Sequence, residues 1–247
     1  MSYFDHFAQS RGTVLGNRLS RRAVSRQFAH IQRLLPSADS AILEIGSGQG
    51  DLADLFHQAG YHDYTVVEPN ALMRDALAQR GFKTKNYLIP RLDEVNCSYD
   101  ALVLFDVFEH LNDTSAAMTF IAEAARVLRP AGLLCILSPD YLHWQADFFN
   151  CDFSHSNVTS VRRMLQLFHN QRLRVLEYAY FSSFLEGLPA TVLSYAGRAG
   201  LMFANSNGMD RRLYKLKLSC LRRFLIIGRK DHERADDLGE PADAVRT

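Results

Sequence analysis

The stretch Ala41-Ile-Leu-Glu-Ile-Gly-Ser-Gly-Gln-Gly50 decides the fold that we expect of this chain. It opens as a short apolar run that holds one acid, Glu44, and then carries three glycines at alternate positions, Gly46, Gly48 and Gly50. From Asp51 onward, apolar side chains recur at helical spacing up to Gly60, where a helix can end. A strand, a glycine turn and a helix form the first half of a nucleotide-binding βαβ unit, because glycines let the backbone approach a ligand that a Cβ would exclude.

A second apolar run, residues 64–67, ends at Glu68. This acid follows the glycine turn at roughly the 20-residue offset at which a carboxylate meets ribose hydroxyls. The glycines run G-x-G-x-G instead of the dinucleotide pattern G-x-G-x-x-G, and Glu44 and Asp51 place carboxylates at the mouth of the turn. Carboxylates repel a pyrophosphate and attract a cation. We therefore expect an adenosine-containing cofactor that carries an ammonium and a sulfonium group.

The segment 44–51, together with Glu68, closely resembles motifs I and II of the class I S-adenosylmethionine-dependent methyltransferases. The alternative is a glycine-rich turn in another α/β protein. The resemblance implies that S-adenosylmethionine is the cofactor, with Glu68 on its ribose hydroxyls and the glycine turn under its methionine part. The cofactor-binding residues it implies are Glu44, Gly46, Ser47, Gly48, Gly50, Glu68, Pro69, Asp106 and Val107.

The rest of the chain alternates strand and helix, which predicts an α/β fold with a doubly wound, mostly parallel sheet. Further strands are expected at 101–105, 133–137, 173–180 and 224–227, and helices at 118–128 and 161–168. Residues 129–132, Arg-Pro-Ala-Gly, are expected to stop the first of these helices. The family resemblance implies seven strands, the last of them antiparallel.

We expect one methyltransferase domain over residues 1–230, followed by a disordered polar tail at 231–247. Residues 1–35 form an N-terminal helical extension whose arginines face a phosphorylated acceptor or simply solvent. These arginines are Arg11, Arg18, Arg21, Arg22, Arg26 and Arg33. Residues 182–219 are too long for a simple connection and form a helical insertion before the last strand. Its apolar residues suit a lid over the acceptor, a homodimer contact or a peripheral membrane surface.

Ligands of a doubly wound sheet bind beyond the carboxyl ends of the strands, where Asp106 and His110 follow a buried strand. Methyl transfer to a hydroxyl needs a base for the hydroxyl proton, and histidine titrates near neutral pH. His110 is therefore the first candidate base. The alternative is a histidine that caps a helix or packs against one.

Residues 105–113 resemble the motif after strand 4 in the small-molecule branch of these methyltransferases, which includes ubiquinone-pathway and natural-product O-methyltransferases. Some relatives bind a divalent ion through two acids and a histidine spaced as Asp106, Glu109 and His110, with a further histidine where His155 stands. That resemblance implies a possible Mg²⁺ or Mn²⁺ site. Aspartate replaces the usual glutamate at Asp106, so its reach is shorter, and the alternative is that Asp106 contacts the cofactor while Glu109 forms an ion pair.

Asp152-Phe-Ser-His155, which follows Pro139-Asp140, resembles a D-x-[ST]-H element of methyltransferases encoded for surface-polysaccharide assembly. This implies His155 as a second catalytic candidate; the alternative is an N-terminal helix cap. We expect an O-methyltransferase that acts on a hydroxyl of a saccharide or a saccharide-linked small molecule. The alternatives are a methyltransferase of quinones or other phenolic metabolites and a non-catalytic, cofactor-binding partner subunit.

The composition of the chain limits the kinds of partner that we expect it to bind. The 247 residues carry a net charge of +1, which gives no global field toward nucleic acid. The four cysteines are scattered, and neither a secretory signal nor an apolar run of membrane-spanning length is visible. We expect a cytoplasmic, reduced protein that binds a small-molecule or saccharide acceptor.

Overall fold

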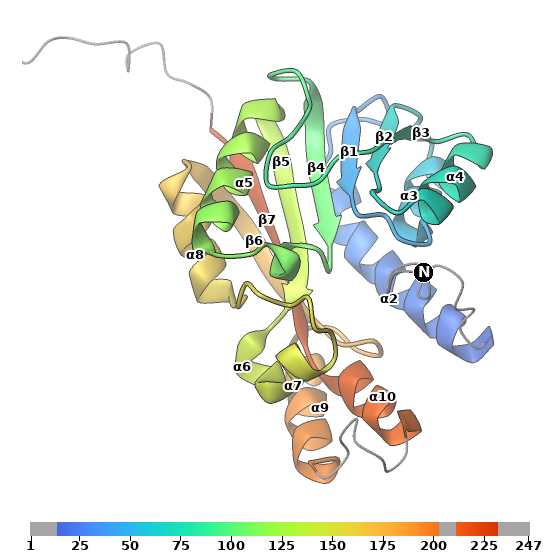
Figure 1. Ribbon diagram of the computed structural model, residues 1–247, viewed down its shortest axis with the longest axis vertical. Helices are drawn as coiled ribbons and strands as arrows, with labels where there is room; N and C mark the ends of the chain where they lie inside the picture. Colours follow the sequence, from blue (N-terminus) through green and yellow to red (C-terminus); the bar gives the residue numbers. More distant parts are fainter. Residues whose placement is uncertain (1–13, 203–210, 232–247) are drawn as a thin grey trace, which may run out of the picture.

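The computed structural model describes residues 14–202 and 211–231, which form one sheet with helices on both faces (Figure 1). The strands are β1 Ile42–Ile45, β2 Tyr64–Val67, β3 Lys83–Lys85, β4 Tyr99–Phe105, β5 Leu128–Pro139, β6 Leu173–Phe181 and β7 Arg223–Lys230. They lie in the order β3-β2-β1-β4-β5-β7-β6, and β7 runs antiparallel to both of its neighbours while the other pairs are parallel. The predicted seven-stranded, mostly parallel sheet with an antiparallel last strand is confirmed.

The helices are α2 Val14–Gln32, α3 Asp51–Gln58, α4 Ala71–Gln79, η1 Phe108–His110, α5 Thr114–Val127, α6 Tyr141–Trp144, α7 Ala146–Asn150, α8 Val161–Asn170, α9 Gly187–Gly200 and α10 Arg211–Cys220. Helices α5 and α8 cover one face of the sheet, and α2 and α3 cover the other. The N-terminal helix and the helical insertion are present as expected. Residues 1–13 and the polar segment 232–247 lie outside the described residues.

The central strands are buried on both faces, which explains why they read as continuous apolar runs. In β4, Leu102 and Leu104 pack under α5 and α8, whereas Ala101 and Val103 pack under α2 and α3. Successive side chains of a strand point to opposite faces, so each run supplies both layers of the core. Cys135 in β5 is fully buried in the second layer, where it packs as a small hydrophobe.

Helix α5 ends at Val127, so residues 129–132 follow its end as predicted. The strand predicted at 133–137 is longer than expected, because β5 begins at Leu128 and includes these four residues. The ladder pairs Tyr99 with Leu128 and then Ala101 with Leu133, so 129–132 bulge out opposite Asp100. Arg129 Nη1 lies 2.5 Å from Asp100 Oδ2 and ties the bulge to β4.

Strand β3 was not predicted. Its sequence, Lys-Thr-Lys, is short and polar, and none of its side chains is buried, so it lacks the apolar signal of a strand. It forms because its backbone pairs in parallel with β2 and completes that edge of the sheet.

The carboxyl ends of the parallel strands meet at the end of the sheet where α6, α7, α9 and α10 also lie (Figure 1). Helix α9 packs against β6 and α10, so the insertion joins the core at this end. Across residues 14–202 and 211–231, no helix combines the length and apolarity that crossing a bilayer requires.

The packing of β7 against α8 gives a stability prediction. A Cβ on Gly228 would lie 2.4 Å from Phe168 Cδ1, and the Phe168 ring is fully buried. Gly228→Ala should therefore lower the free energy of unfolding by about 1–3 kcal/mol, measured by urea denaturation. Gly200→Ala is the matched control, because a Cβ there meets nothing within 4 Å. Equal stability of Gly228→Ala and the wild type would contradict the described packing.

Candidate functional site

A cavity of about 1070 Å³ opens beyond the carboxyl ends of the parallel strands. The glycine turn after β1, the segment after β2 and the η1 segment after β4 form its strand side. Helix α2 contributes one face through Gly16, Leu19, Ser20 and Ala23, which recur at helical spacing. The cavity is therefore closed by parts of the chain that are distant in sequence.

The turn after β1 must be glycine where it meets η1. Gly46 has a φ of +70°, and a Cβ on it would lie 2.5 Å from Val107 Cγ2. Gly48 also has a positive φ, of +54°. Both glycines and Val107 line the cavity, so bare backbone is presented to whatever the cavity holds.

Glu68 lies at the end of β2 and connects the glycine turn to α4. Its Oε2 accepts a hydrogen bond from the Gly48 N–H at 3.2 Å, and its Oε1 accepts one from the Asn70 N–H at 2.9 Å. Burial is the largest cause of the raised pKa of Glu68, and these two hydrogen bonds oppose it. Glu68 and Pro69 both line the cavity, as expected of cofactor-binding residues.

Three of the residues assigned to the cofactor do not line the cavity: Glu44, Ser47 and Gly50. Glu44 points into the protein, where the Tyr64 hydroxyl donates to its Oε2 at 2.8 Å. Burial is the largest cause that raises the pKa of Glu44 to about 7. Gly50 precedes α3 with a φ of +80°, and a Cβ there would meet Leu77 and Arg80. These three residues therefore lie on the side of the turn that faces the protein interior and not the cavity.

Asp106 and Val107 line the cavity at the end of β4. Asp106 has a φ of +53°, and its Oδ2 lies 2.5 Å from Arg223 Nη1 of β7. Arg223 also lines the cavity, and sequence reasoning missed it because its partner stands 117 positions earlier in the chain. The carboxylate of Asp106 is thus held by an arginine from β7, two strands away from β4 in the sheet.

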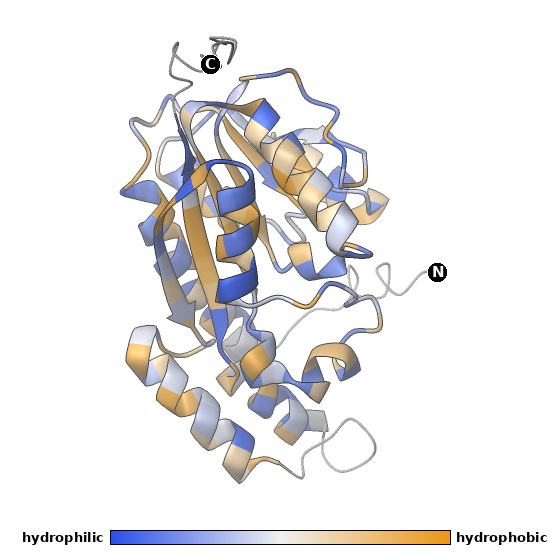
Figure 2. Cartoon of the chain, turned by 90° about the vertical axis from the view of Figure 1, so that its left-hand side faces the viewer, coloured by the Kyte–Doolittle hydropathy of each residue, from blue (hydrophilic) through white to orange (hydrophobic). Residues whose placement is uncertain are grey.

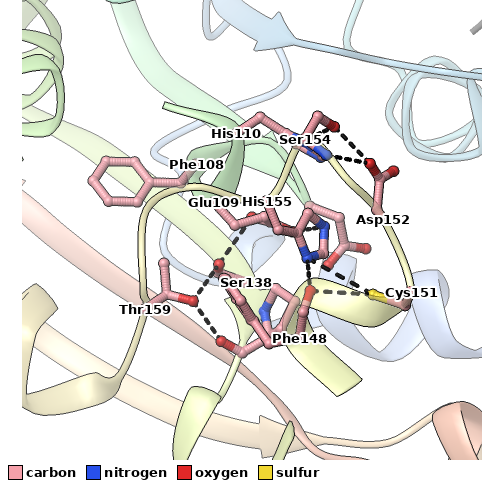
Figure 3. A network of polar contacts seen from close by, with 12 residues as sticks. Phe108, Glu109, His110, Ser138, Phe148, Cys151, Asp152, Ser154, His155 and Thr159 are labelled. Atoms are coloured by element: carbon pink, nitrogen blue, oxygen red, sulfur yellow. Dashed lines mark hydrogen bonds and ion pairs between the residues drawn. The ribbon is translucent and has the colours of Figure 1, made fainter. Parts of the chain in front are cut away.

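His110 is oriented by a short chain of polar groups (Figure 3). Its Nδ1 lies 2.9 Å from Ser154 Oγ, which lies 2.6 Å from Asp152 Oδ1. A carboxylate accepts hydrogen bonds, so the Ser154 hydroxyl donates to Asp152 and accepts from His110 Nδ1–H. This leaves Nε2 of His110 with its lone pair. Burial, and next the neighbouring His155, lower the pKa of His110 and keep its ring neutral at pH 7.

In His155, as in His110, Nε2 keeps its lone pair, but here the partner of Nδ1 is a backbone carbonyl. Its Nδ1 lies 2.6 Å from the Phe148 carbonyl oxygen, which can only accept, so Nδ1 carries the proton. The two histidine rings lie 4.8 Å apart between centroids. Both histidines line the cavity, so the structure brings together the two candidate catalytic residues.

Glu109 lies beside the two histidines. It is 1% exposed, its Oε2 accepts from the Ser138 hydroxyl at 2.9 Å, and its Oε1 has no hydrogen-bond partner within the described part of the chain. Burial, followed by the charge of Asp106, raises the pKa of Glu109 well above its usual value. One ligand atom from each of Glu109, His110 and His155 lies within 4.8 Å of the others. Asp106, the fourth predicted ligand, is not part of this group and faces Arg223 instead.

The charge of the cavity lining favours a cationic ligand. The acids in the lining are Glu68, Asp106, Glu109 and Asp152, against Arg223 as the single arginine or lysine contributed by the described residues. The expectation that N-terminal arginines face the acceptor is not met by Arg18 and Arg22. Both are exposed and lie on other faces of α2 than Leu19 and Ala23, which line the cavity. Arg11 lies outside the described residues.

The insertion reaches the cavity by its ends and not by its first helix. Ser183 and Phe184 precede α9, and Leu218 and Ser219 close α10; these four line the cavity. No residue of α9 does, although a lid over the acceptor was one of the three roles considered for residues 182–219. Together with the α2 face, these are the wall residues that sequence patterns alone did not identify, because only tertiary packing brings them there.

Comparisons with known proteins agree with this geometry. A family model described as "Methyltransferase domain" matches residues 18–178. A probable S-adenosylmethionine-dependent methyltransferase of Mycobacterium tuberculosis strain H37Rv is 27% identical over 172 residues, which cover 63% of this chain and 62% of the relative. The chain thus matches less than two thirds of that relative's length.

Solved structures share the fold. A chain from the complex between the Haloferax volcanii Trm112 methyltransferase activator and a presumed methyltransferase aligns with a TM-score of 0.68 at 15% identity, over 94% of this chain and 99% of that one. Geranyl diphosphate methyltransferase in complex with S-adenosylmethionine aligns with a TM-score of 0.64 at 14% identity, over 92% and 94%.

The burial of Glu44 predicts a pH effect on stability. Its pKa is about 7 in the folded protein against an ordinary value of 4.5, so the stability that its neutral form contributes is present below pH 4.5 and is lost as pH rises through 7. Glu44→Gln keeps an acceptor for Tyr64 and cannot ionise. Its advantage in unfolding free energy over the wild type should therefore grow between pH 5 and 8, by on the order of 3 kcal/mol. Urea titrations at each pH measure it, and exposed Asp39→Asn is the control. A difference that does not change with pH would contradict the assignment.

Proposed function

This chain belongs to the methyltransferase domain family of the class I S-adenosylmethionine-dependent enzymes, and from that membership we propose that it methylates a hydroxyl of a saccharide or saccharide-linked small molecule. The observation that carries the proposal is the position of His110 in the same cavity as the glycine turn and Glu68, with its Nδ1 engaged by Ser154 and its Nε2 left with a lone pair. A base and a cofactor platform that share one cavity are what methyl transfer to oxygen requires.

The residues present fit the cofactor. The bare backbone of Gly46 and Gly48 leaves room for its methionine part, and the Glu68 carboxylate is placed to accept ribose hydroxyls. The acidic lining stabilises a sulfonium ion and disfavours a pyrophosphate. Bound S-adenosylmethionine supplies an electrophilic methyl group.

In the proposed reaction, His110 holds and moves the proton. Its Nε2 would accept the proton of the acceptor hydroxyl as that oxygen takes up the methyl group, which S-adenosylmethionine would supply. Ser154 and Asp152 keep Nδ1 of His110 protonated and fix the orientation of the ring. Nε2, which takes no part in this contact, is therefore the basic nitrogen. The cavity wall from α2 and from the ends of the insertion limits the access of water.

The same side chains support a second version, in which a divalent ion activates the hydroxyl. Glu109 Oε1 is buried and unpartnered within the described residues, and the Nε2 atoms of both histidines keep their lone pairs. Two histidines and one carboxylate are a common ligand set with open positions for substrate. Glu109, His110 and His155 would hold such an ion, which would supply Lewis-acid activation.

The saccharide acceptor rests on the Asp152-Phe-Ser-His155 element, whose Asp152, Ser154 and His155 all contact the candidate base or its hydrogen-bond partner. Assays of the purified protein with labelled cofactor, against nucleotide sugars and against phenols, test this part of the proposal. Transfer to phenols alone would replace the saccharide by a quinone-like or phenolic acceptor and leave the methyltransferase activity in place.

The role of His110 gives a kinetic prediction. Without its base, His110→Ala should lose about 10²–10⁴-fold in kcat while it keeps its affinity for S-adenosylhomocysteine. His169→Ala, an exposed histidine of α8, is the matched control and should leave kcat unchanged. Full turnover by His110→Ala would exclude it as the base.

Removal of divalent ions by a chelator distinguishes the mechanism with His110 as general base from the mechanism with a divalent ion. If Glu109, His110 and His155 hold a divalent ion, EDTA abolishes activity and Mg²⁺ or Mn²⁺ restores it. Full activity in EDTA excludes the ion and leaves His110 as a general base.

A further inference from the structure

Helix α9 exposes an apolar stripe. Leu188, Val192 and Tyr195 follow one another at helical spacing and are 74%, 60% and 58% exposed. The buried residues of the helix, Ala190, Ser194 and Gly197, lie on the opposite side, where α9 packs against the core and α10. Leu188 and Val192 therefore face away from the protein body, while the Tyr195 ring also packs at its edge against His143, with the ring centroids 4.4 Å apart.

The exposed apolar side chains continue beyond α9. Met202 follows the helix at 62% exposure, and Leu213 and Leu216 of α10 are 41% and 45% exposed. We call the six side chains Leu188, Val192, Tyr195, Met202, Leu213 and Leu216 the α9–α10 surface. Both helices lie at the same end of the molecule (Figure 1), and Figure 2 shows hydrophobic segments along the outer side of α9.

Within the described residues of α9 and α10, every charged side chain is positive. Neither α9 nor α10 contains an aspartate or glutamate, and Arg212 and Lys215 of α10 are exposed. The acids that border the two helices are engaged: Glu186 contacts His30 at 2.7 Å, and Asp147 pairs with Lys217 at 2.7 Å. The surface thus combines exposed apolar groups with positive charge.

We propose that the α9–α10 surface docks on an anionic lipid bilayer. Apolar side chains on the outer face of a helix gain free energy when they enter the headgroup boundary, and lysine and arginine beside them are attracted to anionic lipids. Charge complementarity favours this occupant, because the described residues of α9 and α10 offer no carboxylate and so lack the alternating charges that pair two protein surfaces. The docking does not depend on which acceptor is methylated.

The α9–α10 surface lies close to the cavity, so docking through it would also place the cavity. The segments that flank its helices, Ser183–Phe184 before α9 and Leu218–Ser219 at the end of α10, line the cavity. A protein docked through α9 and α10 would hold its cavity close to the lipid headgroups. An acceptor that is anchored in the bilayer could then present its polar group without leaving the membrane.

Vesicle sedimentation tests the proposal. The wild type should sediment with equimolar phosphatidylglycerol and phosphatidylcholine vesicles, much less with phosphatidylcholine alone, and less as salt rises. Val192→Glu should lower the partition coefficient about tenfold, and Lys215→Ala about fivefold. The matched control is Met118→Glu, an apolar residue of α5 that is 43% exposed and lies outside the surface; it should bind like the wild type.

Unchanged affinity of Val192→Glu for S-adenosylhomocysteine, measured by calorimetry, shows that the variant is folded. Three outcomes overturn the proposal: no binding of the wild type to anionic vesicles, equal binding to both kinds of vesicle, or equal binding of Val192→Glu and the wild type. A dimer that Val192→Glu dissociates, without vesicle binding by the wild type, would assign the surface to a second copy of the chain and also overturn it.

Discussion

The close approach of the glycine turn to the end of β4 is the constraint on which the rest of the site depends. At Gly46 a Cβ would lie 2.5 Å from Val107, so any other residue would push β1 and β4 apart where their carboxyl ends meet. Because the two ends meet, Glu68, which follows β2, lines the same cavity as Asp106 and His110, which follow β4. The chemistry proposed for His110 follows from this geometry, since the base must lie near the place where the cofactor methyl group would be held.

The second governing feature is the burial of acids with few compensating cations. Glu44, Glu68 and Glu109 are all nearly inaccessible, and burial is the leading cause of the raised pKa of each. Such burial costs stability, because the charged form is poorly solvated. Of these acids, Glu68 and Glu109 line the cavity, where the positive charge of a sulfonium cofactor would compensate theirs and so couple its binding to stability.

Periodicity and the glycine pattern were sufficient for an alternation of strands and helices in a mostly parallel sheet, because both depend on local spacing and on strands buried on two faces. The family resemblance supplied the number of strands and the antiparallel last strand. Periodicity missed β3, whose Lys-Thr-Lys sequence has no apolar face, and the start of β5, where residues 129–132 follow the helix end as predicted but bulge within the strand. In the site, residues next to strand ends were found. Arg223, the α2 face and the ends of the insertion were not, because long-range packing places them. Glu44 was assigned to the ligand because an acid in that motif reads the same whether it faces the cavity or Tyr64.

The most direct test of the central claim, that this cavity holds S-adenosylmethionine, is calorimetry of cofactor binding. The wild type should bind S-adenosylhomocysteine more tightly than NAD, and Glu68→Ala should weaken that binding by about 1.5–3 kcal/mol, the scale of hydrogen bonds to a charged group. Tighter binding of NAD by the wild type would contradict the account. So would an affinity for S-adenosylhomocysteine that Glu68→Ala leaves unchanged.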